Sequence, residues 1–267
     1  QRFLTECGTG DPPSRARREA HLARLRAIAE EECADREQRG LVGYPLLWQV
    51  DRRAIMEDLT TWYDREVAER DDALRPGAFE LRFGPKWTHD REDSPLSTDD
   101  PVPLQADGLT LRFQGRIDRI DWSPNRSAFR VVDYKTGRRP SHHKDDCLSG
   151  GRALQLPIYL LAASHVLGIP WEQGEAEYFY VTRRGEFKRV RFSGATLRDR
   201  WEEFTALLQG LAEGIAAGRF HPVPGPSREH CTYCDYSTVC DIRIARLAER
   251  KAADPRAEDF ARLGEVM

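Results

Sequence analysis

Two aspartates on neighbouring predicted strands give the clearest chemical signal in the sequence. Asp118 ends the run GRID, and Asp133 interrupts the otherwise apolar run VVDYK. A carboxylate in such a strand is costly to bury unless another group compensates its charge. Two strands joined by a hairpin can place Asp118 and Asp133 side by side, where a divalent cation would relieve their repulsion. Mg²⁺ (or Mn²⁺) suits such a pair, because Mg²⁺ binds one or two carboxylates and keeps several waters for a substrate phosphate.

Lys135 adds a positive charge to this predicted site. It follows Asp133 by two residues, and residues i and i+2 of a strand point to the same face of the sheet. An ammonium group there can stabilise the extra negative charge of a phosphoryl transition state and orient the attacking water. The alternative interpretation is a surface salt bridge between Asp133 and Lys135, since the pattern D-x-K also arises by chance.

Gln155 and Tyr159 lie on the predicted helix that follows these strands. They are one helical turn apart and therefore share a face of the helix. Both side chains can form hydrogen bonds to phosphates or brace the lysine. Taken alone, such a pair is also typical of an ordinary helix surface.

The motifs GRID, VDYK and QLPIY together resemble those of the PD-(D/E)XK nuclease superfamily. The likeness is closest to the RecB-like nuclease domains of bacterial helicase–nuclease complexes, especially the AddB type, and it covers nearly the whole chain. It implies a restriction-endonuclease-like fold, an α/β class with a mixed central sheet flanked by helices. It also implies DNA as substrate and a helicase domain or partner subunit. The site residues that the resemblance implies are Asp118 and Asp133 as metal ligands, the Tyr134 backbone carbonyl as a further ligand, Lys135 as the catalytic lysine, Gln155 and Tyr159 as the Q-x-x-x-Y motif, and Glu80 near the same site.

The sequence departs from the family at one position. The family usually has a metal-binding histidine in an upstream G-x-x-x-H helix, and no such context occurs here. His21 lies on a charged helix in a different setting and is not assigned to the site. The first residues, QRFLTEC, read like the end of a helix, so we expect the chain to be a piece of a longer polypeptide, in which the histidine is either present upstream or absent.

Three of the six cysteines crowd into the segment CTYCDYSTVC: Cys231, Cys234 and Cys240. Thiolates at this spacing bind iron–sulfur clusters or zinc. The AddB-like nucleases carry C-x₂-C-x₅-C at this place, completed by an N-terminal cysteine, which implies a structural [4Fe–4S] cluster here. The candidates for the fourth ligand are Cys7, Cys33 and Cys147. A zinc site completed by His230 or His221 is the alternative, and three uncoordinated cysteines are the simplest interpretation.

Basic residues near the predicted site suggest a path for the DNA backbone. Their affinity for phosphates would depend on salt but not on base sequence. The same residues also fit a solvated hairpin face whose charge is balanced by Glu186. The candidates for DNA binding are Arg138, Arg139, Arg183, Arg184 and Lys188.

Periodic apolar residues and turn signals predict the elements that must position these groups. We expect one nuclease domain over 1–267, with an N-terminal helical part (1–75), a catalytic core (76–195) and a C-terminal part (196–267) that carries the cysteines. Residues 85–107 are rich in Pro, Asp, Ser and Thr and read as an exposed loop. The expected helices are 13–38, 45–70, 151–167, 195–217 and 241–263, and the expected strands are 78–84, 109–123, 128–137 and a hairpin within 176–193.

Composition excludes several classes of protein. The chain has 267 residues, of which 40% are hydrophobic, enough for a core and too many for a disordered tail. No apolar run approaches 18 residues, so we expect no membrane span and no membrane partner. The net charge of −3 is not that of a histone-like DNA binder. The sequence shows no secretory signal, which together with the crowded cysteines predicts a reducing, cytoplasmic location.

The site residues together with the resemblance therefore predict a Mg²⁺-dependent deoxyribonuclease. The resemblance further implies an exonuclease-like enzyme that acts in DNA repair or recombination. The in-line attack of water on a phosphodiester bond would be the reaction. An inactive DNA-binding scaffold of the same superfamily is the second hypothesis, because the histidine is missing. A zinc-binding adaptor, in which only the cysteine segment matters, is the third.

Overall fold

The computed structural model describes residues 1–8, 12–71, 73–86, 93–106, 108–220, 222–224, 228–232, 234–236, 238–240, 243–251 and 254. These residues form two compact units. The first contains residues 1–105, 110–146 and 155–199, and the second contains residues 106–109, 147–154 and 200–267.

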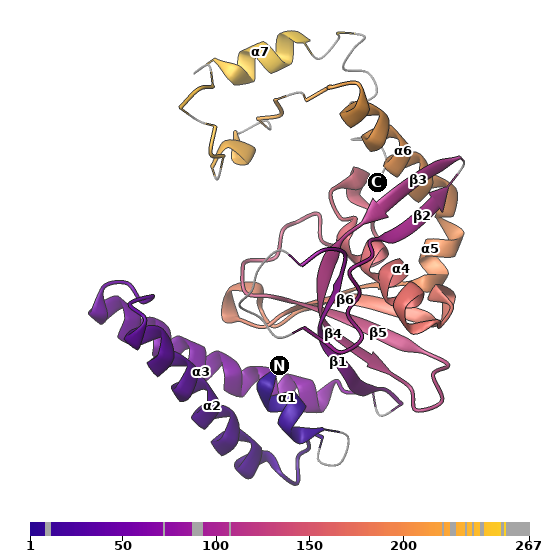
Figure 1. Cartoon of the computed structure of the whole chain (residues 1–267). Helices are drawn as coiled ribbons and strands as arrows, with labels where there is room; N and C mark the ends of the chain where they lie inside the picture. The colour runs from indigo at the N-terminus through magenta and orange to yellow at the C-terminus, as the bar shows by residue number, and fades with distance from the viewer. Residues whose placement is uncertain are drawn as a thin grey trace. The chain divides into compact units, whose positions relative to one another are not determined.

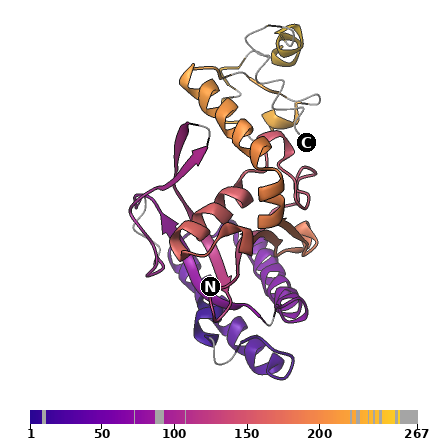
Figure 2. The same ribbon diagram turned by 90° about the vertical axis from the view of Figure 1, so that its right-hand side faces the viewer.

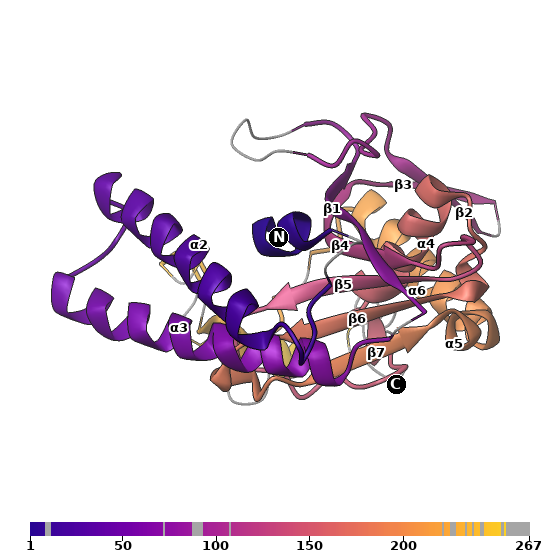
Figure 3. The ribbon, with the colours of Figure 1, turned by 90° about the horizontal axis from the view of Figure 1, so that it is seen from below.

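Three helices begin the first unit: α1 (Arg2–Cys7), α2 (Arg18–Gln38) and α3 (Pro45–Ala68). Pro45 stands at the first turn of α3, where its missing N–H costs no helical hydrogen bond. Helices α2 and α3 pack side by side, and α1 lies against α2 (Figure 3). Their inward-facing residues, among them Leu22, Leu25 and Trp62, are buried.

Five strands form the central sheet of this unit: β1 (Arg75–Phe83), β4 (Gly115–Trp122), β5 (Phe129–Lys135), β6 (Gly174–Tyr180) and β7 (Arg189–Ser193). Their order is β1-β4-β5-β6-β7, which can be followed in Figure 3. Figure 1 shows the same sheet from another side, with β1, β4, β5 and β6 labelled. Strands β5 and β6 are parallel, and the other neighbours are antiparallel. A parallel pair needs a long crossover connection, and helix α4 (Gln155–Leu167) supplies it.

Helices cover both faces of the sheet. Helix α4 packs across β5, β6 and β7 (Figure 2) and buries Leu156, Leu160 and Ala163. On the other face, residues of α1, α2 and α3 form one apolar cluster with Val132 of β5 and Phe179 of β6. The expected α/β class, with a mixed central sheet flanked by helices, is confirmed. Helix α5 (Gly194–Asp199) and the short helices η2 (Trp171–Gln173) and η3 (Arg183–Gly185) complete this unit.

The second unit is helical. It contains η1 (Ser149–Gly151), α6 (Trp201–Ala216), η4 (Glu229–Cys231) and α7 (Ile244–Lys251). Helix α6 buries Phe204, Leu207 and Leu208. In the described part of the chain, no helix is both long enough and apolar enough to cross a membrane.

Some expected boundaries were wrong. The single strand expected at 109–123 is two strands in different sheets, β3 (Leu109–Phe113) and β4. Strand β3 pairs with β2 (Val102–Ala106), inside the expected loop. Gly108 between them has a φ of 83°, a left-handed conformation that suits a tight turn. The Pro- and Asp-rich composition of the preceding residues concealed this hairpin.

The expected helices also differ in extent. The helix expected at 195–217 is divided into α5 and α6, and α4 begins at Gln155 instead of 151, because the short helix η1 and a turn precede it. The last expected helix is confirmed only over α7; of its remainder, residues 241–242, 252–253 and 255–263 lie outside the described residues.

Candidate active site

Asp118 and Asp133 meet where strands β4 and β5 separate. The last paired residues of the two strands at this end are Arg119 and Val132. One step further along the same register, Asp118 stands opposite Asp133, and directly opposed residues of an antiparallel pair project to the same face. The backbone amide of Tyr134 donates a hydrogen bond to Oδ2 of Asp118 at 2.8 Å. A carboxylate thus takes the place of a backbone acceptor at the point where the strands part.

Asp133 is 4% exposed and is held from two sides. Its Oδ1 accepts a hydrogen bond from Nε2 of Gln155 at 3.0 Å. Its Oδ2 is buried, lies 2.5 Å from Nζ of Lys135 in an ion pair, and receives no hydrogen bond of regular geometry within the described residues. Burial raises the pKa of Asp133 to about 6; Lys135 opposes this shift and the charge of Asp118 adds to it. A further cation beside these oxygens would stabilise the ionised form.

Gln155 and Tyr159 of α4 complete a chain of polar contacts with the strand. Oε1 of Gln155 accepts a hydrogen bond from Nζ of Lys135 at 2.9 Å. Nε2 of the same amide donates to the hydroxyl of Tyr159 at 3.0 Å, besides its bond to Asp133. The Tyr159 ring packs edge-on against Phe83, with ring centres 6.2 Å apart. The helix that crosses over the sheet therefore fixes the lysine and the aspartate together.

The backbone of Tyr134 directs both its amide and its carbonyl to the side of β4, where Asp118 lies. Its amide faces Asp118, whereas the next carbonyl along, that of Lys135, faces β6 and accepts from the amide of Val181 at 2.9 Å. Backbone groups of successive strand residues alternate in direction, so the Tyr134 carbonyl is directed to the side of β4. Two carboxylates and one carbonyl are oxygen ligands of the kind that Mg²⁺ prefers. The residues present fit such an ion.

Glu80 of β1 lies in register with Asp118, between the pairs Phe79–Arg119 and Leu81–Ile117. Its φ of 50° is in the left-handed region, which is uncommon for a residue with a side chain and marks local strain. Its Oε2 lies 3.5 Å from Nη1 of Arg116. Glu80 was expected near the site only from the resemblance, and no pattern in the sequence predicted its backbone conformation.

Two aromatic residues beside Lys135 were not foreseen from the sequence. Nζ of Lys135 lies 4.9 Å from the centre of the Tyr178 ring, a distance at which a cation is attracted to the ring face. The imidazole of His143 stacks on the same ring with centres 4.4 Å apart, and its Nδ1 lies 2.7 Å from the hydroxyl of Tyr180. The alternation of Tyr178, Phe179 and Tyr180 on a strand was the available signal. His143 had none, because it comes from an irregular segment.

The five residues of the predicted basic path fall into two groups: three whose side chains contact an oxygen of this chain, and two that form no ion pair within the described residues. Arg183 forms ion pairs with Glu57 at 2.8 Å and Asp58 at 3.3 Å, and Lys188 lies 3.1 Å from Glu186. Nη1 of Arg139 donates to the carbonyl of His143 at 2.8 Å. Arg138 and Arg184 are exposed, and no carboxylate of the described chain forms an ion pair with either.

Arg138 and Arg184 also lie on adjoining turns. Thr182 Oγ1 donates to the carbonyl of Thr136 at 3.0 Å. Gly185 stands so close to Gly137 that an added Cβ atom would lie 3.0 Å from the Gly137 carbonyl. Arg138 follows Gly137 and is three residues after Lys135, and Arg184 precedes Gly185.

The structure does not gather the cysteines into a metal site. Among the described residues, no three His, Cys, Asp or Glu side chains form a group that could hold a metal ion. Cys234 and Cys240 are exposed, and Cys231 is half-buried. Of the other candidates, Cys33 is buried in α2, and Cys147 Sγ lies 3.1 Å from Ser149 Oγ. His221 lies outside the described residues. The cluster stays a prediction.

The comparison with known families bears directly on this geometry. Residues 1–241 match the family model of the PD-(D/E)XK nuclease superfamily. The chain belongs to this superfamily. Membership implies chemistry of the nuclease type, and PD-(D/E)XK nucleases generally use Mg²⁺ or Mn²⁺. The resemblance drawn from GRID, VDYK and QLPIY is thereby confirmed at the level of the superfamily.

One relative among curated proteins is the Gene 69 protein of Mycobacterium phage D29. It is 30% identical to this PD-(D/E)XK protein over 139 residues, which are 52% of this chain and 45% of the phage protein. The match thus spans about half the length of either chain.

Proposed function

We propose that this PD-(D/E)XK protein is a metal-dependent DNA nuclease that hydrolyses phosphodiester bonds. The observation that supports it is the placement of Asp118, Asp133 and Lys135 on one face of the sheet, with Lys135 in an ion pair with Asp133 and bound to Gln155. Asp118, Asp133 and the Tyr134 carbonyl would hold the ion. A bound Mg²⁺ would supply Lewis-acid chemistry, by polarising the phosphate and acidifying water.

The residues themselves perform the remaining tasks. Lys135 places a positive charge where negative charge builds up on the phosphoryl oxygens. Its hydrogen bond to Gln155 fixes the position of the ammonium group before the substrate binds. Tyr159 orients the Gln155 amide. Because Asp133 is almost fully buried, water has little access to its carboxylate, and electrostatic interactions are stronger in such surroundings.

A cleavage assay tests the proposal. Labelled single- and double-stranded DNA is incubated with wild-type protein, Asp133→Asn and Lys135→Ala, with Mg²⁺, with Mn²⁺ or with EDTA. We expect wild-type cleavage only with the metals, and a loss of about 10²–10³-fold or more in each variant. Asp199→Asn, at a carboxylate whose side chain is 70% exposed, is the matched control and should cleave normally. Equal cleavage by wild type and Lys135→Ala, with both proteins folded by circular dichroism, would refute the assignment.

We further propose that the protein acts as an exonuclease in DNA repair or recombination, in the cytoplasm, together with a helicase domain or partner subunit. The support is the resemblance to AddB-type domains in the order of motifs and in the spacing of Cys231, Cys234 and Cys240. Affinity purification from the native host, followed by an assay for ATP-dependent unwinding, tests this. Recovery without any ATPase would count against it.

A [4Fe–4S] cluster on these three cysteines is part of the same proposal, with zinc as the alternative metal. Protein purified without oxygen should contain iron and sulfide in about equal amounts, close to four each per chain for this cluster type. Substitution of Cys234 by Ser should abolish both, whereas Cys33→Ser leaves them unchanged if Cys33 is not the fourth ligand. Zinc without sulfide would favour the adaptor interpretation.

The inactive scaffold stays a second candidate for one reason. The described residues offer Asp118 and Asp133 no third His, Cys, Asp or Glu side chain as a metal ligand. A protein that binds DNA with Mg²⁺ present and leaves it intact, in the assay above, would support this candidate.

A further inference from the structure

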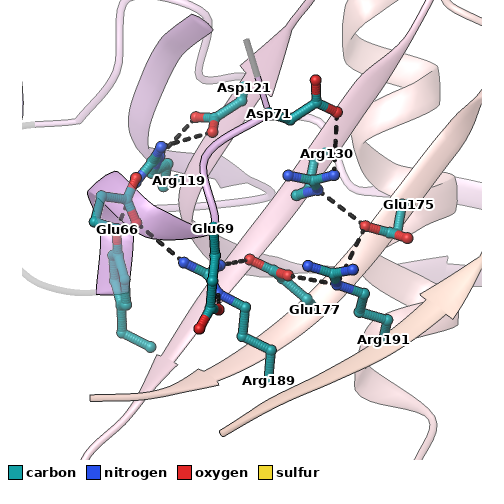
Figure 4. A network of polar contacts seen from close by, with 11 residues as sticks. Glu66, Glu69, Asp71, Arg119, Asp121, Arg130, Glu175, Glu177, Arg189 and Arg191 are labelled. Atoms are coloured by element: carbon teal, nitrogen blue, oxygen red, sulfur yellow. Dashed lines mark hydrogen bonds and ion pairs between the residues drawn. The ribbon is translucent and has the colours of Figure 1, made fainter. Parts of the chain in front are cut away.

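The face of the sheet behind the carboxylates carries a buried network of charges. Side chains alternate between faces along a strand, so Arg119 points away from Asp118, and Tyr134 points away from Asp133 and Lys135. Arg119 enters the network on that second face (Figure 4), and the Tyr134 hydroxyl joins it by accepting a hydrogen bond from Arg119. Its charged members are Glu66, Glu69, Asp71, Arg119, Asp121, Arg130, Glu175, Glu177, Arg189 and Arg191.

Arg119 forms four hydrogen bonds to three neighbouring side chains in this space. Its Nε and Nη2 bind the two oxygens of Asp121 at 2.6 and 2.7 Å. Its Nη1 donates to Oε1 of Glu66 at 2.7 Å and to the hydroxyl of Tyr134 at 3.0 Å. Arg119 and Glu66 are each 4% exposed, and Asp121 is 5% exposed. Hydrogen bonds to ionised groups in such surroundings are short, directional and hard to displace.

The network joins α3 to the sheet behind the site. Oε2 of Glu66 lies 3.2 Å from Nη2 of Arg189, which also pairs with Glu177 and lies over the Phe179 ring. Burial acts to raise the pKa of Glu66, but Arg119 and Arg189 outweigh it and hold this pKa below its usual range. Glu66 is therefore an ionised anchor from the helix to two different strands.

The bond between Arg119 and Tyr134 crosses from β4 to β5 where their backbone pairing ends. Arg119 is the last residue of β4 that pairs with β5, and its partner is Val132. Tyr134 lies two residues further along β5, on the diagonal that long side chains can span. Beyond this point the two strands are joined by two polar links, one on each face: Tyr134 N to Asp118, and Arg119 to the Tyr134 hydroxyl.

We propose that Arg119 is a positioning residue for the metal site, and that it acts through the Tyr134 hydroxyl to fix the segment that bears Asp133 and the Tyr134 carbonyl. This proposal rests on the proposed nuclease function. The Tyr134 side chain reaches the network through its hydroxyl, at the far end of the ring. Anchoring this end limits rotation of the backbone that carries the carbonyl. Groups that orient metal ligands in this manner commonly change metal affinity or activity by 10–100-fold when removed.

Tyr134→Phe isolates the contact. It deletes only the hydroxyl and retains the ring beside Phe179, while Glu66 and Asp121 continue to compensate Arg119. Binding of Mn²⁺ is measured by calorimetry and by electron paramagnetic resonance, and cleavage is measured against Mn²⁺ concentration. We expect about tenfold weaker Mn²⁺ binding and an equal rise in the Mn²⁺ needed for half-maximal cleavage. Arg119→Lys, which keeps a positive charge, should shift both in the same direction.

Glu175→Gln is the matched control. Glu175 belongs to the same network through Arg130, at 2.9 Å, and in the described chain neither a hydrogen bond nor an ion pair joins it to Tyr134. Its Mn²⁺ affinity should equal that of wild type. Unchanged affinity in Tyr134→Phe, or an equal loss in Glu175→Gln, would overturn the positioning role while leaving the nuclease function intact. Failure of wild-type protein to bind Mn²⁺ at all would refute both.

Discussion

The Nζ atom of Lys135 lies 2.5 Å from Oδ2 of Asp133, and the two side chains share one face of β5. In isolation this is the salt bridge that the pattern D-x-K also permits. The pair differs from a surface salt bridge because Asp133 is 4% exposed and because Gln155 binds both partners. The proposed nuclease function requires a carboxylate and an ammonium group held in this way.

Gln155→Leu should lower the cleavage rate by about 10–100-fold, because it removes the amide that binds Lys135 and Asp133 at once. Tyr159→Phe is the milder companion: it deletes one hydroxyl that contacts only Gln155 among these groups, and it should cost less. Initial rates at saturating Mg²⁺ measure both. A larger loss in Tyr159→Phe than in Gln155→Leu would contradict the bridging role of the amide.

Removal of Arg138 and Arg184 together should lower the affinity for DNA and should make that affinity depend less steeply on salt concentration. Each exposed arginine that contacts a phosphate contributes about one unit to the slope of log affinity against log salt concentration, so the double Ala variant should lose about two. Fluorescence anisotropy in the Asp133→Asn background, over a series of salt concentrations, gives this slope without cleavage.

The matched comparison is the double variant Arg183→Ala and Lys188→Ala. These side chains already form ion pairs with Glu57 and Glu186, so their loss should change the slope less. If this second pair proves the more important, the DNA backbone does not follow the turns at Arg138 and Arg184.

His143 should make stability depend on pH. Burial, together with the positive charges of His142, Lys135 and Arg139, lowers the pKa of His143 to about 4 from an ordinary value of 6.5. The unfolded chain therefore binds a proton more readily than the folded one between these values, and the stability that the neutral ring contributes above pH 6.5 is lost as pH falls toward 4.

Urea unfolding of wild type and His143→Phe between pH 7 and pH 4 checks this. The Phe ring can stack on Tyr178 but cannot titrate, so the stability advantage of wild type over the variant should shrink as pH falls. Tyr180→Phe keeps the imidazole and loses only its hydrogen-bond partner, so it should retain the pH dependence. A constant difference between wild type and His143→Phe would show that the ring does not titrate in this manner.

Gly174→Ala should destabilise the fold by about 1–3 kcal/mol. A Cβ atom at the start of β6 would meet the ring of Phe129 and lie 2.7 Å from Cδ1 of Leu160. Gly214→Ala in α6 is the control, because a Cβ atom there has no neighbour within 4 Å. Alanine should stabilise that helix by up to about 1 kcal/mol. Thermal unfolding of both variants distinguishes close packing from a general intolerance of substitution.

The sequence alone predicted the local part of the site. Asp133 and Lys135 share a face because strand side chains repeat every two residues, and Gln155 and Tyr159 share one because a helical turn spans about four. The α/β class and the pairing of the strands that carry Asp118 and Asp133 followed from the same short-range patterns, and the superfamily followed from the resemblance of the motifs GRID, VDYK and QLPIY. The β2–β3 hairpin did not, because its Pro- and Asp-rich residues lack a strand pattern and only pairing between them defines it.

Tertiary structure alone decided which distant groups meet. Gln155 contacts Asp133 because α4 packs on the face of the sheet to which Asp133 projects. Glu66 contacts Arg119, 53 residues away in the sequence, because α3 packs on the opposite face. The same packing sorted the arginines, leaving Arg138 and Arg184 without carboxylate partners in the described chain while Arg183 is paired with α3. Such contacts depend on the packing of whole elements, which residue spacing along the chain does not encode.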